Sequence, residues 1–476
     1  MKTFTENALH IFAQLNAIPR ASHHEEQVAD FLCRYAEGLG LEYDRDAENC
    51  VVIRKAATPG HEAAPTVVLL NHMDMVAVGD GSRPFDPLAD GIEAYTEDGW
   101  MKARGTSLGA DNGIGLSMAL AVLADDSLVH PALEVLTTTN EEDGMSGAAG
   151  LSTTFIHGRK VINLDSEDYD TITVGAAGAY LQTATIPLRP LTPPPSCDKF
   201  YKVAIRGGLG GHSGVDINKH RINAISELCH FLRALRETDC ASLCLAEICG
   251  GDANASIPSH CAAIVGISSA ECESFEALVR LHEERIRSMY DEPLVGLTVE
   301  ETAPRPLITS CDILYVVDHI PCGVLRMRDD MPGTVMTSNN IGIIRTETGS
   351  IHVSCHTRSF SDEEMVRTAE DISRHFEEAG ADVCVVMNTP GWQENTDSAY
   401  LALVDQAFVD VLHFSPRKVA MHFVLEAGYY VQKYPGIEIA CIGPRIVEPH
   451  STKERVELST VDDICRVLVV LLSRLA

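Results

Sequence analysis

The sequence is poor in positive charge. Its 476 residues include 37 lysines and arginines against 68 aspartates and glutamates, which gives a formal net charge of −31 at pH 7. Binding to nucleic acid or to an anionic membrane surface relies on Lys and Arg side chains that displace counterions from phosphates. The composition therefore argues against both partners. Hydrophobic content of 45% and charged content of 22% are typical of a globular chain, and the length predicts two or three domains.

The sequence also lacks a long apolar run and any C-x-x-C pair. A membrane-spanning helix needs about 20 apolar residues, whereas the longest run near the C-terminus covers only 467–472. The N-terminal residues alternate at helical spacing and predict a folded helix, not a signal peptide. The 15 cysteines are scattered, so we expect free thiols in a soluble, cytoplasmic protein. The three closest cysteines have no zinc-ribbon spacing and are better interpreted as buried thiols; they are Cys240, Cys244 and Cys249.

Strand-like runs alternate with helical patterns as far as about residue 175. This alternation predicts an α/β layer with a largely parallel sheet. The predicted strands cover 50–55, 66–71, 133–139 and 160–164, with a helix at 114–123. Open α/β sheets bind ligands beyond the carboxyl ends of their strands, so the polar residues there are the first candidates for a functional site.

A different pattern begins after Gly175. Five prolines between 187 and 195 predict an extended hinge. The predicted elements that follow are a strand at 201–205, a helix at 219–236, strands at 242–249 and 261–267, a helix at 271–289 and a strand at 295–301. This β-α-β-β-α-β order is ferredoxin-like, and a second, incomplete copy is predicted up to residue 388. Because the α/β pattern then returns, we predict one α/β domain at 1–177 and 392–476, interrupted by an α+β domain at 178–391.

The first candidate pair, His72 and Asp74, follows the predicted strand 66–71. Residues two apart in an extended chain point to the same side, so the two side chains share a face. A carboxylate beside an imidazole commonly fixes the tautomer of a metal-bound histidine. A polar strand end would also contain His or Asp by chance, so the pair alone is weak evidence.

The second candidate is Asp111, in the glycine-rich stretch 105–115. No lysine follows the glycines, and the pattern is neither a P-loop nor G-x-G-x-x-G. Taken alone, Asp111 is more easily interpreted as a helix N-cap. The glycines would equally allow the backbone to approach a metal centre closely.

Three consecutive acids, 141–143, follow the predicted strand 133–139. Acid runs are usually solvated, but this one begins at the carboxyl end of a predicted central strand. Adjacent residues point in different directions, so one glutamate could bind a metal while its neighbour acts as a general base. Together with other strand ends, the candidates are two imidazoles and three carboxylates: His72, Asp111, Glu142, Asp165 and His450. Such a set suits two zinc-like ions bridged by a carboxylate.

Seven motifs in order resemble those of the co-catalytic metallopeptidase family that includes aminoacyl-histidine dipeptidases, carnosinases, aminoacylases and carboxypeptidase G. The motifs are N-H-M-D-M-V, G-T-S-L-G-A-D-N-G-I-G, T-N-E-E-D-G-M-S-G-A, N-L-D-S-E, G-L-G-G-H-S-G, N-A-S-I-P and P-H-S-T-K-E-R. The match spans essentially the whole chain and is closest to the dipeptidase branch. It implies a catalytic α/β domain with an inserted lid and dimerisation domain, and therefore a homodimer.

The resemblance also implies roles for individual residues. Two zinc ions, replaceable by cobalt or manganese, would be held by His72 and Asp165 on one side and by Glu142 and His450 on the other, with Asp111 bridging. Asp74 would orient His72, and Glu141 would be the general base.

In the insert, His212 resembles a lid histidine that polarises the scissile carbonyl, although a histidine between glycines is ordinarily a loop residue. Asn254 and Arg358 resemble substrate-binding positions, and a guanidinium fork suits a peptide's terminal carboxylate. Glu426 is a third expected substrate-binding residue, in a segment where the dipeptidase branch usually reads L-E-C-G and this chain has Ala427.

The expected reaction is metal-dependent hydrolysis of dipeptides, with Xaa-His dipeptides such as β-Ala-His as substrates within a broad specificity. The same residues would also suit a tripeptidase or an N-acyl amino acid amidohydrolase. A catalytically silent metal-binding scaffold is disfavoured, because a scaffold has no need of the free base Glu141.

Overall fold

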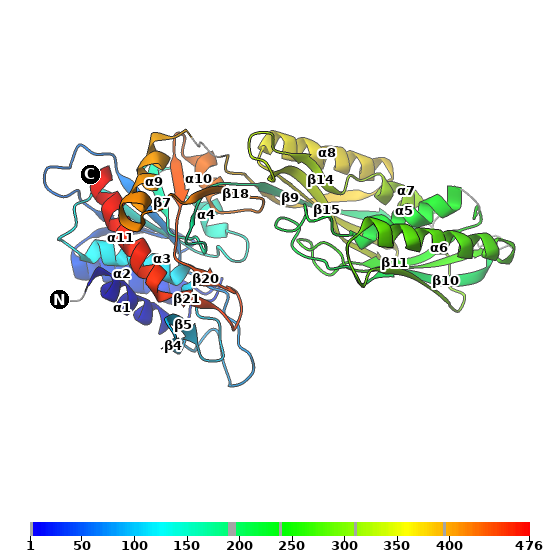
Figure 1. Cartoon of the computed structure of the whole chain (residues 1–476), viewed down its shortest axis with the longest axis horizontal. Helices are drawn as coiled ribbons and strands as arrows, with labels where there is room; N and C mark the ends of the chain where they lie inside the picture. Colours follow the sequence, from blue (N-terminus) through cyan, green and yellow to red (C-terminus); the bar gives the residue numbers. More distant parts are fainter. Residues whose placement is uncertain (1–2, 189–196, 238–239, 309–311, 394–396) are drawn as a thin grey trace. The chain divides into compact units, whose positions relative to one another are not determined.

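The structure, a computed structural model, describes residues 3–188, 197–237, 240–308, 312–393 and 397–476. It divides into two units, which Figure 1 shows in the colours of the sequence. The first contains Met1–Gly175, Glu394–Ala420 and Glu426–Ala476, and the second contains Ala176–Gln393 and Met421–Leu425. Both ends of the chain therefore build the first unit. Most of the expected proline-rich hinge, from residue 189 to 195, lies outside the described residues.

The first unit contains an eight-stranded sheet in the order β1-β2-β6-β3-β7-β19-β8-β18. The strands are β1 (Glu42–Arg45), β2 (Val51–Lys55), β3 (Val67–His72), β6 (Leu133–Thr138), β7 (Lys160–Asn163), β8 (Thr171–Ala176), β18 (Arg417–Met421) and β19 (Glu438–Cys441). The central strands β6, β3, β7 and β19 pair in parallel, whereas β1, β2 and β8 pair antiparallel to their neighbours. The prediction of a mixed α/β fold is confirmed. Every residue of β3 and β6 is buried, as expected for central strands covered on both faces.

Helices pack against this sheet, and the apolar side chains of helices and strands together form the core of the first unit. They are α1 (Phe4–Asn16), α2 (Glu26–Leu39), α3 (Ala110–Ala124), α4 (Ser146–Gly150), α9 (Ala399–Leu412), α10 (Ala427–Lys433) and α11 (Leu458–Leu475). A capping box starts α1: the Thr3 hydroxyl accepts the Glu6 N–H, and the Glu6 carboxylate accepts the Thr3 N–H. Helix α3 is buried on all sides from Ala110 to Leu123, which places its N-terminal loop deep in the unit.

A small sheet in the first unit was not predicted. Its order is β20-β21-β5-β4, with β4 (Ala94–Glu97), β5 (Trp100–Ala103), β20 (Ile446–Val447) and β21 (Arg455–Glu457). Strands of two to four residues are too short to produce a recognisable alternation. This sheet matters for the site because the turn between β20 and β21 carries His450.

The second unit contains one nine-stranded antiparallel sheet in the order β13-β10-β12-β11-β15-β16-β9-β17, with β14 paired to β15. Its strands are β9 (Gly178–Pro187), β10 (Cys197–Arg206), β11 (Cys244–Gly250), β12 (Cys261–Ser268), β13 (Gly296–Glu301), β14 (Gly323–Met327), β15 (Val335–Glu347), β16 (Ser350–Ser359) and β17 (Asp382–Thr389). The two predicted repeats meet where β11 pairs with β15, so they share a single sheet.

The helices of the second unit run alongside this sheet (Figure 1). They are α5 (Ala224–Glu237), α6 (Cys272–Met289), α7 (Asp312–Asp318) and α8 (Asp362–Glu378), with a short 3₁₀ turn η1 (Ser269–Glu271). The predicted start of a helix at residue 219 is wrong. Helix α5 begins at Ala224 because the Asn223 side chain accepts the N–H groups of Ile225 and Ser226, both at 3.1 Å, and so caps the helix there. Within the described part of the chain, every helix is too short or too polar to cross a bilayer.

Candidate metal centre

The five predicted metal ligands come together at the carboxyl ends of the central strands of the first unit. His72 is the last residue of β3, and Asp111 lies in the non-helical first turn of α3. Glu142 and Asp165 follow β6 and β7, and His450 lies in the turn between β20 and β21. Residues separated by hundreds of positions thus meet at one sheet edge, as the rule for open α/β sheets predicts.

The carboxylate of Asp111 lies between the two imidazoles. Its Oδ1 is 3.1 Å from His72 Nε2, and its Oδ2 is 3.0 Å from His450 Nε2. His72 Nε2 is also 3.3 Å from Asp165 Oδ1, and His450 Nε2 is 2.8 Å from Glu142 Oε2. The two oxygens of Asp111 therefore face two separate imidazole–carboxylate pairs.

The alternative role of Asp111, as a helix cap, does not fit this geometry. The N-cap position of α3 is Gly109, and no side chain caps the helix there. Asp111 has non-helical dihedral angles, as an N-cap residue would, but its carboxylate oxygens lie 3.1 and 3.0 Å from the imidazoles of His72 and His450. Its carboxylate is turned towards the imidazoles.

These side chains fit divalent cations. One ligand atom from each of His72, Asp111 and Glu142 lies within 4.8 Å of the other two. Glu142 Oε1 is buried without a hydrogen-bond partner among the described residues, although a carboxylate oxygen is an ordinary ligand for zinc. Of the other four candidate ligand residues, His72, Asp111 and Asp165 have side chains no more than 11% exposed, whereas the side chain of His450 is 46% exposed.

The electrostatics of the site point to the same fit. Burial opposes a charge on His72, yet Asp165 and Asp111 raise its pKa well above the ordinary value. Hydrogen bonds to Asp111 and Glu142 raise the pKa of His450 to about 11. Burial also opposes ionisation of Asp111, but hydrogen bonds from His450 and His72 hold the pKa of its carboxyl well below its usual range. The carboxylates thus create a strong demand for positive charge, which divalent cations would satisfy.

The three consecutive acids 141–143 have different surroundings. Asp143 is exposed and pairs with His23 at 2.9 Å, so the solvated-surface interpretation applies to this residue. Glu142 faces His450. Burial raises the pKa of Glu141 well above its ordinary value, with Asp165, Glu426 and Glu142 adding to the shift. A carboxylate with a high proton affinity beside a metal site is suited to accept a proton.

Asp74 connects His72 to the acidic residues. Its carboxylate is fully buried, and its Oδ1 lies 3.4 Å from His72 Nδ1. It also accepts the backbone N–H groups of Glu141 and Glu142 and the hydroxyl of Ser22. One carboxylate thus orients both the imidazole and the acidic loop.

Two buried charged residues that sequence reasoning did not identify, Arg20 and Glu454, bond the backbone around Asp111. Glu454 stands four positions after His450 within P-H-S-T-K-E-R, so a signal existed in that motif. Arg20 has no comparable signal, because it lies in an ordinary stretch after the first helix.

Glu426 also belongs to the first unit. It is 1% exposed, and its Oε2 accepts the hydroxyls of Thr138 and Tyr430 at 2.8 and 3.2 Å. Burial raises its pKa to about 8, with Asp165 adding to the shift. The segment that departs from the family pattern therefore places a carboxyl group against the end of β6.

The other three predicted residues, His212, Asn254 and Arg358, belong to the second unit. The Nδ1 of His212 accepts the N–H groups of Gly214 and Val215, both at 3.1 Å, which leaves Nε2 to carry the proton of a neutral imidazole. Asn254 is half-buried in the loop after β11.

Arg358, near the end of β16, is only 2% exposed. Its Nε and Nη2 donate to Ser213 Oγ, each at 3.3 Å, whereas its Nη1 has no partner among the described residues. Burial lowers its pKa to about 10. Two further histidines of the second unit, His356 and His422, are buried. Burial lowers the pKa of each, and the charge of Arg358 lowers it further. A guanidinium group with an unused donor is suited to bind an anion.

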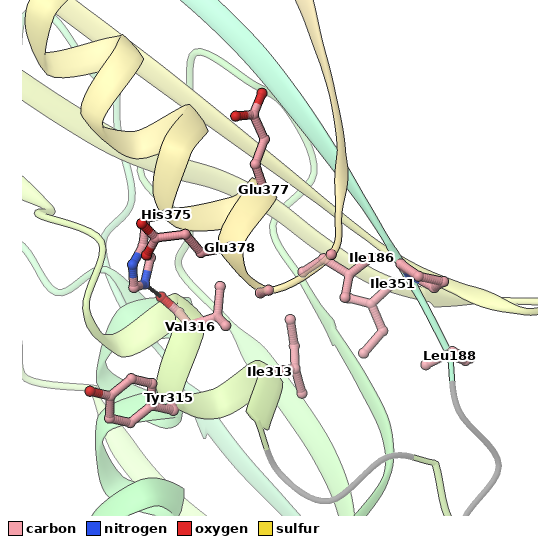
Figure 2. A pocket seen from close by; sticks show the side chains of 12 residues that line it. Ile186, Leu188, Ile313, Tyr315, Val316, Ile351, His375, Glu377 and Glu378 are labelled. Atoms are coloured by element: carbon pink, nitrogen blue, oxygen red, sulfur yellow. Dashed lines mark hydrogen bonds between the residues drawn. The ribbon is translucent and has the colours of Figure 1, made fainter.

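A cavity of about 530 Å³ lies elsewhere in the second unit (Figure 2). Ile313 and Val316 from α7 and Ile351 from β16 contribute to its apolar wall. Figure 2 shows His375, at the end of α8, next to the carbonyl of Val316, which lies 3.0 Å from its Nε2. None of the residues that line this cavity is a predicted site residue, so it is separate from the candidate metal centre.

The chain is similar to known proteins over most of its length. The family model described as "Peptidase family M20/M25/M40" matches residues 68–474. The chain is 33% identical to the cytosol non-specific dipeptidase of Escherichia coli K12 over 471 residues, which cover 98% of this chain and 96% of that protein.

Solved structures are also similar. The crystal structure of aminoacylhistidine dipeptidase from Vibrio alginolyticus has a TM-score of 0.92 and 31% identity, covering 99% of this chain and 98% of that one. A tripeptidase structure from Staphylococcus aureus has a TM-score of 0.62 at 16% identity, with the same coverage, and shows likeness of fold alone.

Proposed function

The chain belongs to peptidase family M20/M25/M40, and from this premise we propose that it hydrolyses dipeptides in a metal-dependent reaction. Membership of the family makes it a peptide hydrolase. Its relatives named as a non-specific dipeptidase and an aminoacylhistidine dipeptidase support Xaa-His dipeptides such as β-Ala-His as substrates, within a broad specificity. The observation that carries the proposal is the position of Asp111, whose two oxygens face separate imidazole–carboxylate pairs.

We assign two divalent metal ions to this centre, zinc in the first place, with cobalt or manganese as functional replacements. His72, Asp165 and Asp111 Oδ1 would hold one ion. His450, Glu142 and Asp111 Oδ2 would hold the other. When bound, such a pair of ions polarises a carbonyl group and lowers the pKa of a shared water towards about 7.

Glu141 would move the proton. Its carboxylate would accept a proton from the water that attacks the peptide carbonyl and deliver that proton to the nitrogen of the leaving amine. Burial raises the pKa of Glu141 above its ordinary value, which makes its carboxylate a stronger proton acceptor than an exposed glutamate. Asp74 would keep Glu141 in place through its backbone N–H.

The roles of the second unit rest on the sequence resemblance. His212 would donate a hydrogen bond from its Nε2–H to the carbonyl oxygen of the scissile bond. Arg358 would bind the terminal carboxylate of the peptide. Asn254 would contact the substrate as well, and Glu426 of the first unit would complete the substrate-binding residues. The resemblance also supports a homodimer formed through the second unit.

The test compares substrate classes on one purified sample, freed of metal and then reconstituted with zinc, manganese or cobalt. We expect hydrolysis of Xaa-His and other dipeptides with at least one metal, and less activity on tripeptides and N-acetyl amino acids. Preference for N-acetyl amino acids would refute the proposal and identify the protein as an amidohydrolase. Preference for tripeptides would identify it as a tripeptidase instead. Inactivity on all of them with all three metals would favour a scaffold.

A further inference from the structure

Four consecutive backbone N–H groups around Asp111 donate to a single carboxylate. Leu108 and Gly109 donate to Oε2 of Glu454 at 2.7 and 2.9 Å, and Ala110 and Asp111 donate to its Oε1 at 2.7 and 3.3 Å. Glu454 is 3% exposed, so these bonds form out of contact with bulk water. Hydrogen bonds to an ionised acceptor in such surroundings are stronger than neutral ones, and they hold the loop in one conformation.

Arg20 holds the same loop from the other side. Its Nη2 donates to the carbonyl of Gly109 at 2.5 Å, and its Nη1 donates to the carbonyls of Met73 and Asp74 at 3.1 and 3.0 Å. Arg20 is only 1% exposed. Gly109 is therefore held at its N–H by a buried carboxylate and at its C=O by a buried guanidinium.

The backbone at Gly109 is shaped to receive these groups. Its φ angle is +69°, in the left-handed region that favours glycine. A Cβ atom at this position would collide with the Arg20 guanidinium and with the side chain of Met75. Only glycine at this position allows the Arg20 guanidinium to approach the loop this closely.

These contacts connect the segments that carry the ligands. Glu454 lies four residues after His450, and its N–H donates to the carbonyl of Ser451 within the same turn. It therefore joins the turn that carries His450 to the loop that carries Asp111. Arg20 joins that loop to Met73 and Asp74, which directly follow β3. Two buried charges are costly to keep unless backbone dipoles and opposite charges compensate them, so their burial points to a specific task.

We propose that Arg20 and Glu454 are positioning residues of the metal centre, which hold the backbone of residues 108–111 so that the two oxygens of Asp111 face separate ions. This inference rests on the proposed function only in that it requires the site to bind metal. It concerns residues outside the ligand set.

The test measures cobalt binding by Glu454→Gln, because the amide nitrogen of glutamine would point N–H groups at the backbone N–H donors. We expect a dissociation constant for cobalt about 10- to 100-fold higher than in the wild type, with a changed visible absorption spectrum of the bound cobalt. Glu454→Asp keeps the carboxylate and should recover part of the affinity.

Glu134→Gln is the matched control. Glu134 is a buried glutamate of the same unit that accepts the N–H groups of His157 and Gly158, both at 2.8 Å, but it lies at the opposite end of β6 from Glu141. Its substitution should lower stability without changing cobalt affinity or spectrum.

Wild-type affinity and spectrum in folded Glu454→Gln would overturn the inference, and so would an equal loss in Glu134→Gln. If Glu454→Gln does not fold, Arg20→Lys replaces it, since an ammonium group cannot reproduce the planar fork that reaches all three carbonyls. The same affinity loss is expected there, and wild-type binding would again refute the inference. Protein that binds cobalt but hydrolyses no dipeptide would refute the proposed function, while these binding measurements would still decide the role of Arg20 and Glu454.

Discussion

The buried carboxylate of Asp74 accepts the backbone N–H of Glu141 at 3.0 Å. Asp74 follows β3 and Glu141 follows β6, and the two strands are parallel neighbours. The position of the proposed general base is therefore set by a residue on the adjacent strand end, and the same residue lies against the imidazole of His72.

Replacing Asp74 should impair both functions of its carboxylate. In Asp74→Asn, one oxygen is replaced by an amide group that cannot accept a backbone N–H. We expect kcat for dipeptide hydrolysis to fall about 10- to 100-fold and the free energy of unfolding to fall by about 1–3 kcal/mol. Steady-state kinetics and urea unfolding measure these changes. Ser22→Ala, which removes only one hydroxyl donor to Asp74, serves as the control. Unchanged kcat in Asp74→Asn would contradict the assignment.

Glu141→Gln should separate proton transfer from metal binding. Glutamine retains the shape of the side chain but cannot accept the proton, so we expect kcat to fall by about 10²- to 10⁴-fold while bound metal, measured by elemental analysis, stays unchanged. Asp143→Asn is the matched control in the same acidic run, because Asp143 is exposed and paired with His23. It should keep wild-type activity. Substantial activity in Glu141→Gln would rule out this residue as the base.

The two histidines of the site should serve different ions, because they face opposite oxygens of Asp111. Under limiting metal, His450→Ala and His72→Ala are each expected to lose about one of two bound ions. Titration with cobalt, followed by elemental analysis, gives the ratio of metal to protein. His10→Ala, at an exposed position on α1, should keep the wild-type ratio. Retention of both ions by both site variants would show that the imidazoles are not ligands.

His422 predicts an acid sensitivity of the second unit that does not depend on metal. The residue is 8% exposed, with its Nε2 2.8 Å from Ser338 Oγ, and burial together with the charge of Arg358 lowers its pKa to about 3. The unfolded chain takes up a proton near pH 6.5, whereas the folded protein does so only near pH 3. The contribution of His422 to the free energy of unfolding is therefore fully present above about pH 6.5, and it decreases as the pH falls towards 3.

The contribution of His422 to this loss should reach about 2 kcal/mol by pH 5. His422→Gln removes the titrating group, so its free energy of unfolding should vary less with pH than that of the wild type. Urea unfolding at a series of pH values between 5 and 7 measures the difference. His10→Gln should follow the wild-type curve. Identical curves for His422→Gln and the wild type would contradict the depressed pKa.

The strands and ligands of the first unit were accessible to sequence reasoning because their signals are local. The run 67–70 is continuously apolar and is followed two residues later by His72, and the run 133–136 leads towards the acids at 141–143. The predicted start of α5 is wrong because the pattern of apolar residues does not reveal that Asn223 caps the helix. The sequence does not predict the small sheet of the first unit, because its strands are too short to show a two-residue alternation of apolar and polar side chains.

The sequence by itself determined the alternation of strands and helices and the placement of His72, Asp111, Glu142, Asp165 and His450 at element ends, because hydrophobic periodicity and turn chemistry act over a few neighbouring residues. Only the tertiary structure decided which oxygen of Asp111 faces which histidine. It also decided that Glu454, more than 340 residues away in the chain, bonds the loop before Asp111. Such contacts arise when the whole sheet and its loops close around one another, and no local pattern encodes them.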